Sequence, residues 1–235
     1  MTTLITIPGV MSDARTWAPV TEAMTHRFAA IHVADTASDD TLAGMAARAL
    51  EAVSGDLVIM AHSMGGRIAM EMGRQAPGRI RAMILSSTAA EPAGPDEAAH
   101  RHARIAQANA GMADYAQGWA PKVLSRAGAQ DRALLARVRQ MVTDCPPEVH
   151  ERQNLALLHR PDAFAYLGGF DFPVLLLTGS EDHLSTEPVH AEIARALPDA
   201  DSQVIPGGGH LLTFEKPAEV AQAIDNWLTR RRLAL

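Results

Sequence analysis

Three polar residues, Ser63, Asp182 and His210, each follow a different short apolar run of the chain. In the same order, the runs are LVIMA (57–61), VLLLT (174–178) and SQVI (202–205). A serine hydroxyl attacks a carbonyl carbon well only when a base takes its proton and an acid orients that base. An imidazole and a carboxylate can supply these two functions. The three residue types therefore predict nucleophilic chemistry on a carbonyl group.

The serine lies in the stretch MAHSMGGRIAM, residues 60–70, between a run typical of a buried strand and one typical of a helix. The flanking residues form half of a G-x-S-x-G pattern, with Ala61 in place of the first glycine and Gly65 as the second. A strained turn at Ser63 needs small residues at both positions, because they are expected to crowd each other. The backbone N–H of Met64 and the helix dipole would then face a developing oxyanion.

The other interpretation of Ser63 is a helix N-cap in a nucleotide-binding fold, which also favours a junction of strand, glycine and helix. The glycines of this stretch do not form G-x-G-x-x-G, nor a phosphate-binding loop with lysine. The sequence around Ser63 therefore favours the nucleophile.

The elements that must position these residues are short apolar runs that alternate with helical patterns. Besides the three runs above, they include LITI (4–7), AAIHVA (29–34) and AMILSS (82–87). Such runs are too short for helices and do not alternate in polarity, as expected of parallel strands covered on both faces. Strands that alternate with helices predict a doubly wound α/β sheet of about six strands. Open sheets of this kind place their sites at the carboxyl ends of the strands, where the three polar residues are expected.

The alternation breaks between about residues 89 and 168, where the sequence has helical patterns without a convincing strand. We expect a helical lid at 89–168, inserted between two parts of one core domain, 1–88 and 169–235. The lid carries nine basic and nine acidic residues between Glu91 and Asp162, so the rest of the chain carries the whole net charge of −6. This balance favours an anionic or neutral ligand beneath the lid, although ordinary solvated helix faces would have the same composition.

The composition limits the possible partners and compartments. With 27 acidic and 21 basic residues, the chain is not expected to bind nucleic acid or an anionic membrane in general. Cys145 is the only cysteine, so no intrachain disulfide can form. The N-terminal MTTLITIPGVM has no basic leader, and no apolar run approaches the length of a membrane span. We expect a cytoplasmic monomer or homodimer that acts on a small molecule.

These motifs together resemble the α/β-hydrolase fold superfamily over nearly the whole chain. The resemblance rests on the elbow AHSMGG, the loops TGSEDHLST and GGGH, and the pattern L-L-x-x-E-x-P after His210. It implies a mostly parallel sheet flanked by helices, with a helical lid. It also implies Ser63 as nucleophile, His210 as base and Asp182 as acid, with no cofactor and no metal. Glu181 is the alternative acid, which the spacing of the family disfavours.

The resemblance further implies that the N–H groups of Met64 and Val10 form an oxyanion hole. The first turn of the family often contains His-Gly, whereas this chain has Pro8 and Gly9, so the second donor could be Val10 or Met11. We expect the following side chains to line a substrate pocket: Met11, His62, Met112, Tyr115, Trp119, Met141 and Leu211. The apolar lid residues among them could equally pack the lid onto the core.

The sequence thus predicts a hydrolase that cleaves a small carboxylic ester or lactone through an acyl-enzyme on Ser63. The same three residues could instead cleave an amide or the carbon–carbon bond of a vinylogous diketone. A lyase, a cofactor-free oxygenase and a binding protein without turnover are further alternatives, because a fold does not fix the reaction.

Overall fold

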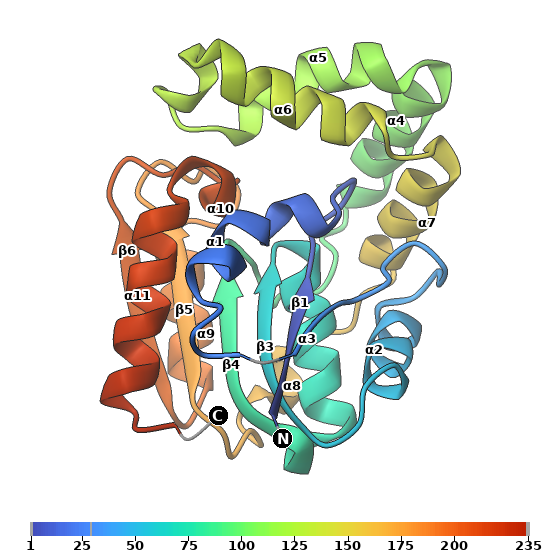
Figure 1. Cartoon of the computed structure of the whole chain (residues 1–235). Helices are drawn as coiled ribbons and strands as arrows, with labels where there is room; N and C mark the ends of the chain where they lie inside the picture. The colour runs from blue at the N-terminus through green and yellow to red at the C-terminus, as the bar shows by residue number, and fades with distance from the viewer. Residues whose placement is uncertain (1, 29, 234–235) are drawn as a thin grey trace.

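A computed structural model describes residues 2–28 and 30–233. These residues form a single six-stranded parallel sheet with helices on both faces (Figure 1). Ala29, at the start of the expected strand 29–34, lies outside the described residues, as do Met1 and residues 234–235. The strand order is β2-β1-β3-β4-β5-β6, and every pairing is parallel. The strands are β1 (Thr2–Ile7), β2 (Ile31–Val33), β3 (Asp56–His62), β4 (Ile80–Ser86), β5 (Val174–Gly179) and β6 (Ala200–Ile205).

The six strands form at the six apolar runs of the sequence, which confirms the α/β fold class. The strand β2 is shorter than the run that predicted it, and it lies at the edge of the sheet, where it pairs only with β1. Its outer side chains are correspondingly exposed, Ile31 by 41% and Val33 by 40%. The central strands β3, β4 and β5 are almost wholly buried.

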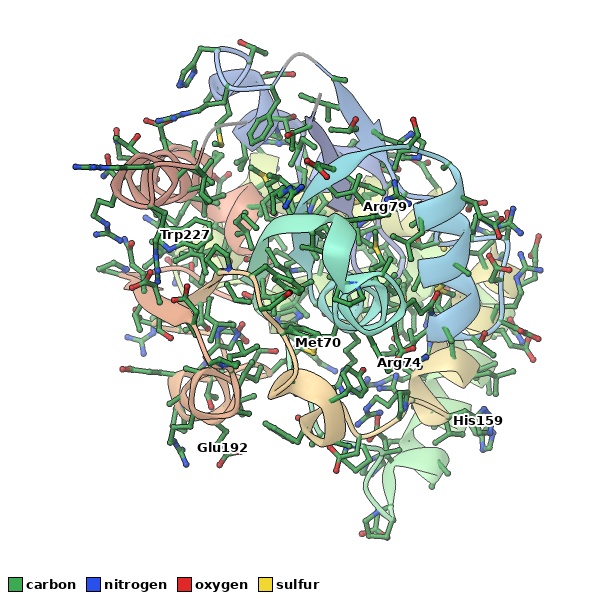
Figure 2. The ribbon with its side chains drawn as sticks, turned by 90° about the horizontal axis from the view of Figure 1, so that it is seen from below. Met70, Arg74, Arg79, His159, Glu192 and Trp227 are labelled. Atoms are coloured by element: carbon green, nitrogen blue, oxygen red, sulfur yellow. The ribbon has the colours of Figure 1, made fainter. Side chains whose placement is uncertain are left out.

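The helices that flank the sheet form two layers. They are α1 (Ala18–Ala23), α2 (Leu42–Glu51), α3 (Met64–Gln75), α9 (Glu187–Ala196), α10 (Leu212–Glu215) and α11 (Pro217–Arg230), with short 3-10 turns η1 (Ala14–Thr16) and η2 (Pro77–Arg79). Their apolar side chains fall into two clusters, one on each face of the sheet. Figure 2 shows Met70 of α3 and Trp227 of α11 in these two layers.

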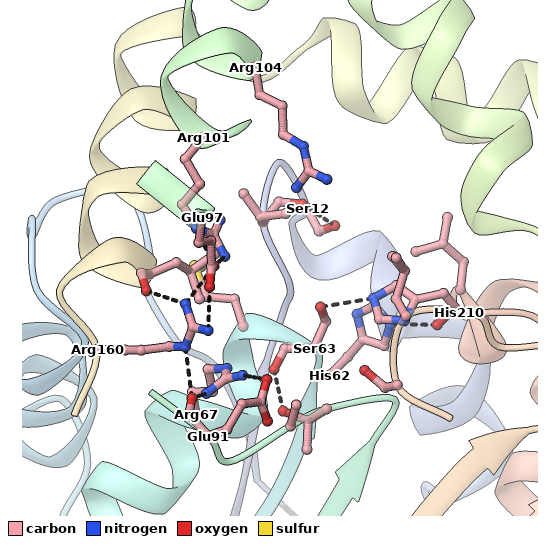
Figure 3. Close-up of a pocket in the computed structure, with 18 of the residues that line it drawn as sticks. Ser12, His62, Ser63, Arg67, Glu91, Glu97, Arg101, Arg104, Arg160 and His210 are labelled. Atoms are coloured by element: carbon pink, nitrogen blue, oxygen red, sulfur yellow. Dashed lines mark hydrogen bonds and ion pairs between the residues drawn. The ribbon is translucent and has the colours of Figure 1, made fainter. Parts of the chain in front are cut away.

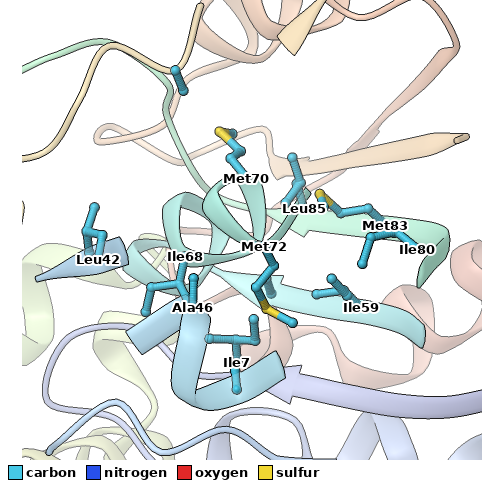
Figure 4. Close-up of a cluster of buried hydrophobic side chains, with 14 of the residues drawn as sticks. Ile7, Leu42, Ala46, Ile59, Ile68, Met70, Met72, Ile80, Met83 and Leu85 are labelled. Carbon is cyan, nitrogen blue, oxygen red and sulfur yellow. The ribbon is translucent and has the colours of Figure 1, made fainter. Parts of the chain in front are cut away.

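The two clusters take alternate residues of each strand, because successive side chains of a strand point to opposite faces. Ile59 and Leu85 pack against α2 and α3 in the first cluster (Figure 4). Met60 and Ile84 pack with Trp227 in the second. Burial on both faces explains why the strand sequences are continuously apolar.

Most of the chain between β4 and β5 forms a separate group of helices beyond the carboxyl ends of the strands, whereas its last short helix packs beside the sheet against α3 and α9 (Figure 1). The helices of this segment are α4 (Glu97–Ala110), α5 (Met112–Val123), α6 (Arg132–Thr143), α7 (Pro147–Leu158) and α8 (Phe164–Leu167), with the 3-10 turn η3 (Gly128–Gln130). We call them the β4–β5 helices. Two small apolar clusters join them to the core, through Leu211 and Phe214 in one and through Met11 in the other. Among the described residues, no helix is long and apolar enough to cross a membrane.

Candidate active site

The serine elbow predicted from the sequence is present at the junction of β3 and α3. Ser63 has a φ of 54° between the last residue of β3 and the first residue of α3. A non-glycine residue rarely adopts such a conformation, and residues that do so gather at functional sites. The turn aims the Ser63 side chain away from the sheet and into a cavity.

The small residues around the elbow are needed for a reason that differs from the one expected. A Cβ atom on Gly65 would collide with the carbonyl oxygens of Ile7 and Pro8, at the end of β1. Ala61 is fully buried and is paired with Ile7 and Leu85 in the neighbouring strands. The close approach of β1, rather than crowding between Ala61 and Gly65, therefore requires glycine at position 65.

The structure brings Ser63, His210 and Asp182 into one hydrogen-bonded chain. His210 Nε2 lies 3.0 Å from Ser63 Oγ. On the other side of the ring, His210 Nδ1 lies 3.1 Å and 3.2 Å from the two carboxylate oxygens of Asp182. An ionised carboxylate only accepts, so Nδ1 carries the proton and Nε2 accepts from the serine hydroxyl. This is the tautomer that a general base at His210 requires.

The environment of Asp182 keeps its carboxylate ionised. Burial by itself would raise the pKa of Asp182, but hydrogen bonds from His210 and from two backbone N–H groups outweigh it and lower the pKa to about 2. The N–H groups of Leu184 and Ser185 each donate to Asp182 Oδ1 at 2.9 Å. Glu181 points elsewhere, and its Oε2 accepts from the N–H of Arg126 at 2.8 Å. The geometry thus favours Asp182 over Glu181 as the orienting acid.

Buried polar groups hold the elbow and the histidine loop in place. The Thr88 hydroxyl donates to the Ser63 carbonyl at 2.7 Å, and the Thr88 N–H donates to His190 Nε2 at 3.1 Å. His62 Nε2 donates to the carbonyl of His210 at 2.8 Å. His62 thereby supports the His210 loop, and His190 supports the Ser63 backbone through Thr88.

The geometry separates the two candidates for the second oxyanion donor. The N–H of Met11 donates to Gln153 Oε1 at 2.9 Å, so it is already engaged. Val10 lines the cavity beside Ser63 and Met64. Among the described residues, neither the N–H of Val10 nor that of Met64 donates a hydrogen bond. Both groups are therefore free to donate to a ligand.

A cavity of about 300 Å³ opens above Ser63 (Figure 3). Of the side chains expected to line a pocket, His62, Trp119 and Leu211 do so. Several residues that the sequence did not single out also line it: Ser12, Arg67, Thr88, Ala89, Glu91, Glu97, Arg101, Arg104, Leu157, Arg160, Leu184 and Ser185. The cavity is thus more polar and more charged than the sequence suggested.

The remaining four expected pocket residues do not line this cavity. Met11, Met112 and Tyr115 are buried together in a cluster that joins α4 and α5 to the core. Met141 is buried among the side chains between α5 and α6. Their apolar character reflects the packing of the β4–β5 helices. Periodicity marks a buried face but does not say what that face is buried against.

The sequence of this chain matches the model of a known protein family. The model of the alpha/beta hydrolase family matches residues 4–223, almost the entire chain. The chain belongs to the alpha/beta hydrolase family. It is accordingly a hydrolase, and the elbow, the acid loop and the histidine loop all lie within the matched range.

Solved structures of other hydrolases are similar over nearly their full lengths. A thermophilic esterase from Thermogutta terrifontis, solved with malate bound, is 25% identical, with a TM-score of 0.88 over 98% of this chain and 90% of that one. An enol-lactonase from Burkholderia xenovorans LB400 is 18% identical, with a TM-score of 0.87 over 97% and 91%. A hydrolase from Pseudomonas aeruginosa PA01 is 22% identical, with a TM-score of 0.83 over 96% and 89%.

Within this hydrolase, the end of α5 is fastened to the loops that carry His210 and Asp182. The Val123 carbonyl accepts from the N–H of His210 at 2.9 Å. Glu215 bridges the same two segments, because its Oε1 accepts from the N–H of Gly209 at 2.9 Å and its Oε2 from the N–H of Ser125 at 2.8 Å. Burial raises the pKa of Glu215 despite these bonds. Glu215 is thus placed to position His210.

We expect Glu215→Gln to lower kcat for 4-nitrophenyl acetate by roughly tenfold, because one amide N–H₂ would face a backbone N–H and displace the His210 loop. The measurement is kcat at a temperature well below the unfolding midpoint of the variant, which is determined separately. The control is Glu219→Gln, which removes the same charge from the exposed start of α11. A kcat within twofold of wild type, in a folded Glu215→Gln protein, would contradict the positioning role.

Proposed function

We propose that this protein is a serine hydrolase that cleaves a small carboxylic ester or lactone through an acyl-enzyme on Ser63. The observation that carries the proposal is the continuous chain of hydrogen bonds from Ser63 through His210 to Asp182, which ends in a cavity large enough for a small molecule. The cavity volume of about 300 Å³ is at the lower end of the range for small-molecule sites.

In the proposed reaction, His210 Nε2 takes the proton of Ser63 as the serine oxygen bonds to the substrate carbonyl carbon. The imidazolium is stabilised by the carboxylate of Asp182. His210 then gives the proton to the leaving oxygen as the carbon–oxygen bond breaks. Water, with its proton taken by His210, attacks the acyl-enzyme and releases the acid, which regenerates the serine.

The negative charge that develops on the carbonyl oxygen is assigned to the N–H groups of Met64 and Val10. Met64 is the first residue of α3, so the helix N-terminus adds its partial positive charge at the same point. The engaged N–H of Met11 supports the choice of Val10. We propose that the β4–β5 helices act as the lid of this site, since α4, α5 and α7 contribute to the cavity lining.

A fluorophosphonate tests this proposal directly, because it phosphonylates an activated serine and stays bound. We expect one covalent addition per chain, located on Ser63 by peptide mass spectrometry, with simultaneous loss of esterase activity. The matched control is Ser12→Ala, which removes another serine that lines the cavity and should leave labelling in place. An unmodified wild-type protein, or a Ser63→Ala variant as active as wild type, would refute the proposal.

A further inference from the structure

The lining of the cavity carries more positive than negative charge. Its ionised side chains, apart from histidine, are Arg67, Arg101, Arg104, Arg160, Glu91 and Glu97. Four positive charges against two negative ones leave a surplus of two. The carboxylate of Asp182 does not line the cavity, because it is buried behind His210.

Three of the four arginines are held in ion pairs. Arg67 Nη2 lies 3.0 Å from Glu91 Oε1. Glu97 is shared by two arginines, with Arg160 Nη1 at 2.6 Å from its Oε1 and Arg101 Nε at 2.7 Å from the same oxygen. Burial would raise the pKa of Glu97, but the two arginines lower it to about 2. Each of the two glutamates is therefore already ion-paired with at least one of these three arginines.

Arg104 is left without a counter-charge. Within residues 2–28 and 30–233, its guanidinium donates no hydrogen bond, and no carboxylate oxygen lies within 4.0 Å of it. Its side chain is exposed, lines the cavity and extends from α4 toward Ser12 (Figure 3). A guanidinium has five donors, all of which are available here.

The surplus of positive charge also affects the pKa values of two of the paired arginines. Burial, together with the neighbouring Arg160, lowers the pKa of Arg67 to about 10. Burial likewise lowers the pKa of Arg101, and Arg160 and Arg104 add to this effect. A bound anion would reduce this repulsion, so the cavity favours an anion over a neutral ligand of the same shape.

We propose that Arg104 binds a carboxylate of the substrate while the reacting carbonyl lies at Ser63. The hydrolase would then act on small esters or lactones that carry a second group, a free carboxylate. This inference rests on the proposed function, because that function places the reacting carbonyl at Ser63.

The shape and position of the site favour a carboxylate. Arg101 and Arg104 are three residues apart on α4, so they share one face of the helix and both line the cavity. The planar fork of a guanidinium matches the two oxygens of a carboxylate. The cavity volume of about 300 Å³ limits the substrate to a short chain between the carboxylate and the reacting carbonyl.

A pair of esters that differ only in charge tests the inference. They are the mono-4-nitrophenyl ester of adipic acid, which keeps a free carboxylate, and its methyl ester, which does not. We expect wild-type kcat/KM to be about tenfold higher for the anionic ester, as for a charge-assisted hydrogen bond at a solvent-accessible site. In Arg104→Gln this ratio should fall to near one, and Arg104→Lys should restore part of it.

The control is Arg132→Gln, which removes a positive charge from an exposed position at the start of α6. It should keep the wild-type ratio. A wild-type enzyme that hydrolyses both esters equally, or an Arg104→Gln variant with an unchanged ratio, would overturn the inference and leave the proposed function standing. Hydrolysis of neither ester would instead count against the proposed function.

A binding measurement without turnover tests the role of Arg104 separately from the proposed function. In a Ser63→Ala background, titration calorimetry would compare monomethyl adipate with dimethyl adipate. We expect the monomethyl ester to bind about tenfold more tightly, and this difference to vanish in Ser63→Ala/Arg104→Gln. Equal affinity for the two probes, or a preference that survives the loss of Arg104, would overturn the inference even if no ester is ever hydrolysed.

Discussion

Replacing Asp182 by asparagine should lower kcat for an aryl ester by about four orders of magnitude, the size of effect seen when the orienting acid of such a triad loses its charge. Asparagine can keep the hydrogen bonds that Asp182 Oδ1 accepts from Leu184 and Ser185. Its amide group would, however, donate to His210 Nδ1. The ring proton then moves to Nε2, which can no longer accept the proton of Ser63.

The neighbouring residue supplies the control for this experiment. Glu181→Gln removes the same charge one position earlier, but Glu181 bonds to the N–H of Arg126 and not to His210. We expect its kcat to stay within about threefold of wild type, as for a change outside the chain of proton transfer. An active Asp182→Asn enzyme, or an equal loss in Glu181→Gln, would show that Asp182 is not the orienting acid. Thermal unfolding of both variants excludes misfolding as the cause.

Acid should destabilise this protein strongly because of three buried histidines. Burial is the main cause that lowers the pKa of His62 to about 3 and those of His150 and His190 to about 4. In the unfolded chain, each imidazole takes up a proton below about pH 6.5. Between that pH and about 4, the unfolded state binds more protons than the folded state, so the free energy of unfolding falls as the pH falls.

At pH 5, each of these histidines should cost about 2 kcal/mol of stability relative to pH 8, and the three together on the order of 6 kcal/mol. This is a large part of the stability of a typical domain. The measurement is the free energy of unfolding by urea as a function of pH. Its slope near pH 5 should correspond to an uptake of about three protons.

His150→Gln should reduce this slope by about one proton, because His150 is buried against Tyr115 and carries one of the depressed pKa values. The comparison is His102→Gln, which replaces an exposed imidazole on α4. Because the His102 side chain is exposed, this variant serves as the control for the loss of an imidazole that is not buried. A wild-type stability that is flat between pH 8 and pH 5 would contradict the prediction.

The alternation of strands and helices could be predicted from the sequence because it depends on local patterns. Apolar runs mark the strands, and parallel strands place their carboxyl ends at one edge. Ser63, Asp182 and His210 each follow a strand, so the topology alone brings them to the same edge. Their mutual hydrogen bonds then depend on loops of only a few residues, which leave little freedom.

The charged part of the cavity could not be predicted in the same way. The spacing of Glu97, Arg101 and Arg104 shows that they share one face of a helix. It does not show which way that face points, because the orientation of α4 depends on how the β4–β5 helices pack on one another. The only signal in the sequence was the balanced charge of this segment within an acidic chain. Nothing in the sequence around Arg67, shortly after the elbow, indicated that its side chain would line the cavity.

Gly65 illustrates a second limit of the sequence. The pattern around Ser63 requires a small residue there, and the structure agrees. The cause lies in Ile7 and Pro8, more than fifty residues earlier in the chain, and in the parallel pairing of β1 with β3. The local motif thus indicated that position 65 is crowded, but it did not indicate which distant residues cause the crowding.

Within the β4–β5 helices, α5 and α4 contact different parts of the site. The end of α5 is bonded to the loops that position His210 and Asp182, whereas Arg101 and Arg104 project from α4. Substitutions on the cavity face of α4 can therefore alter what is bound without touching the backbone that aligns the reacting groups. For a designer of new selectivity, the exposed position of Arg104 on α4 is therefore a place for substitutions, whereas Glu97 and Arg101 of the same helix are tied into ion pairs.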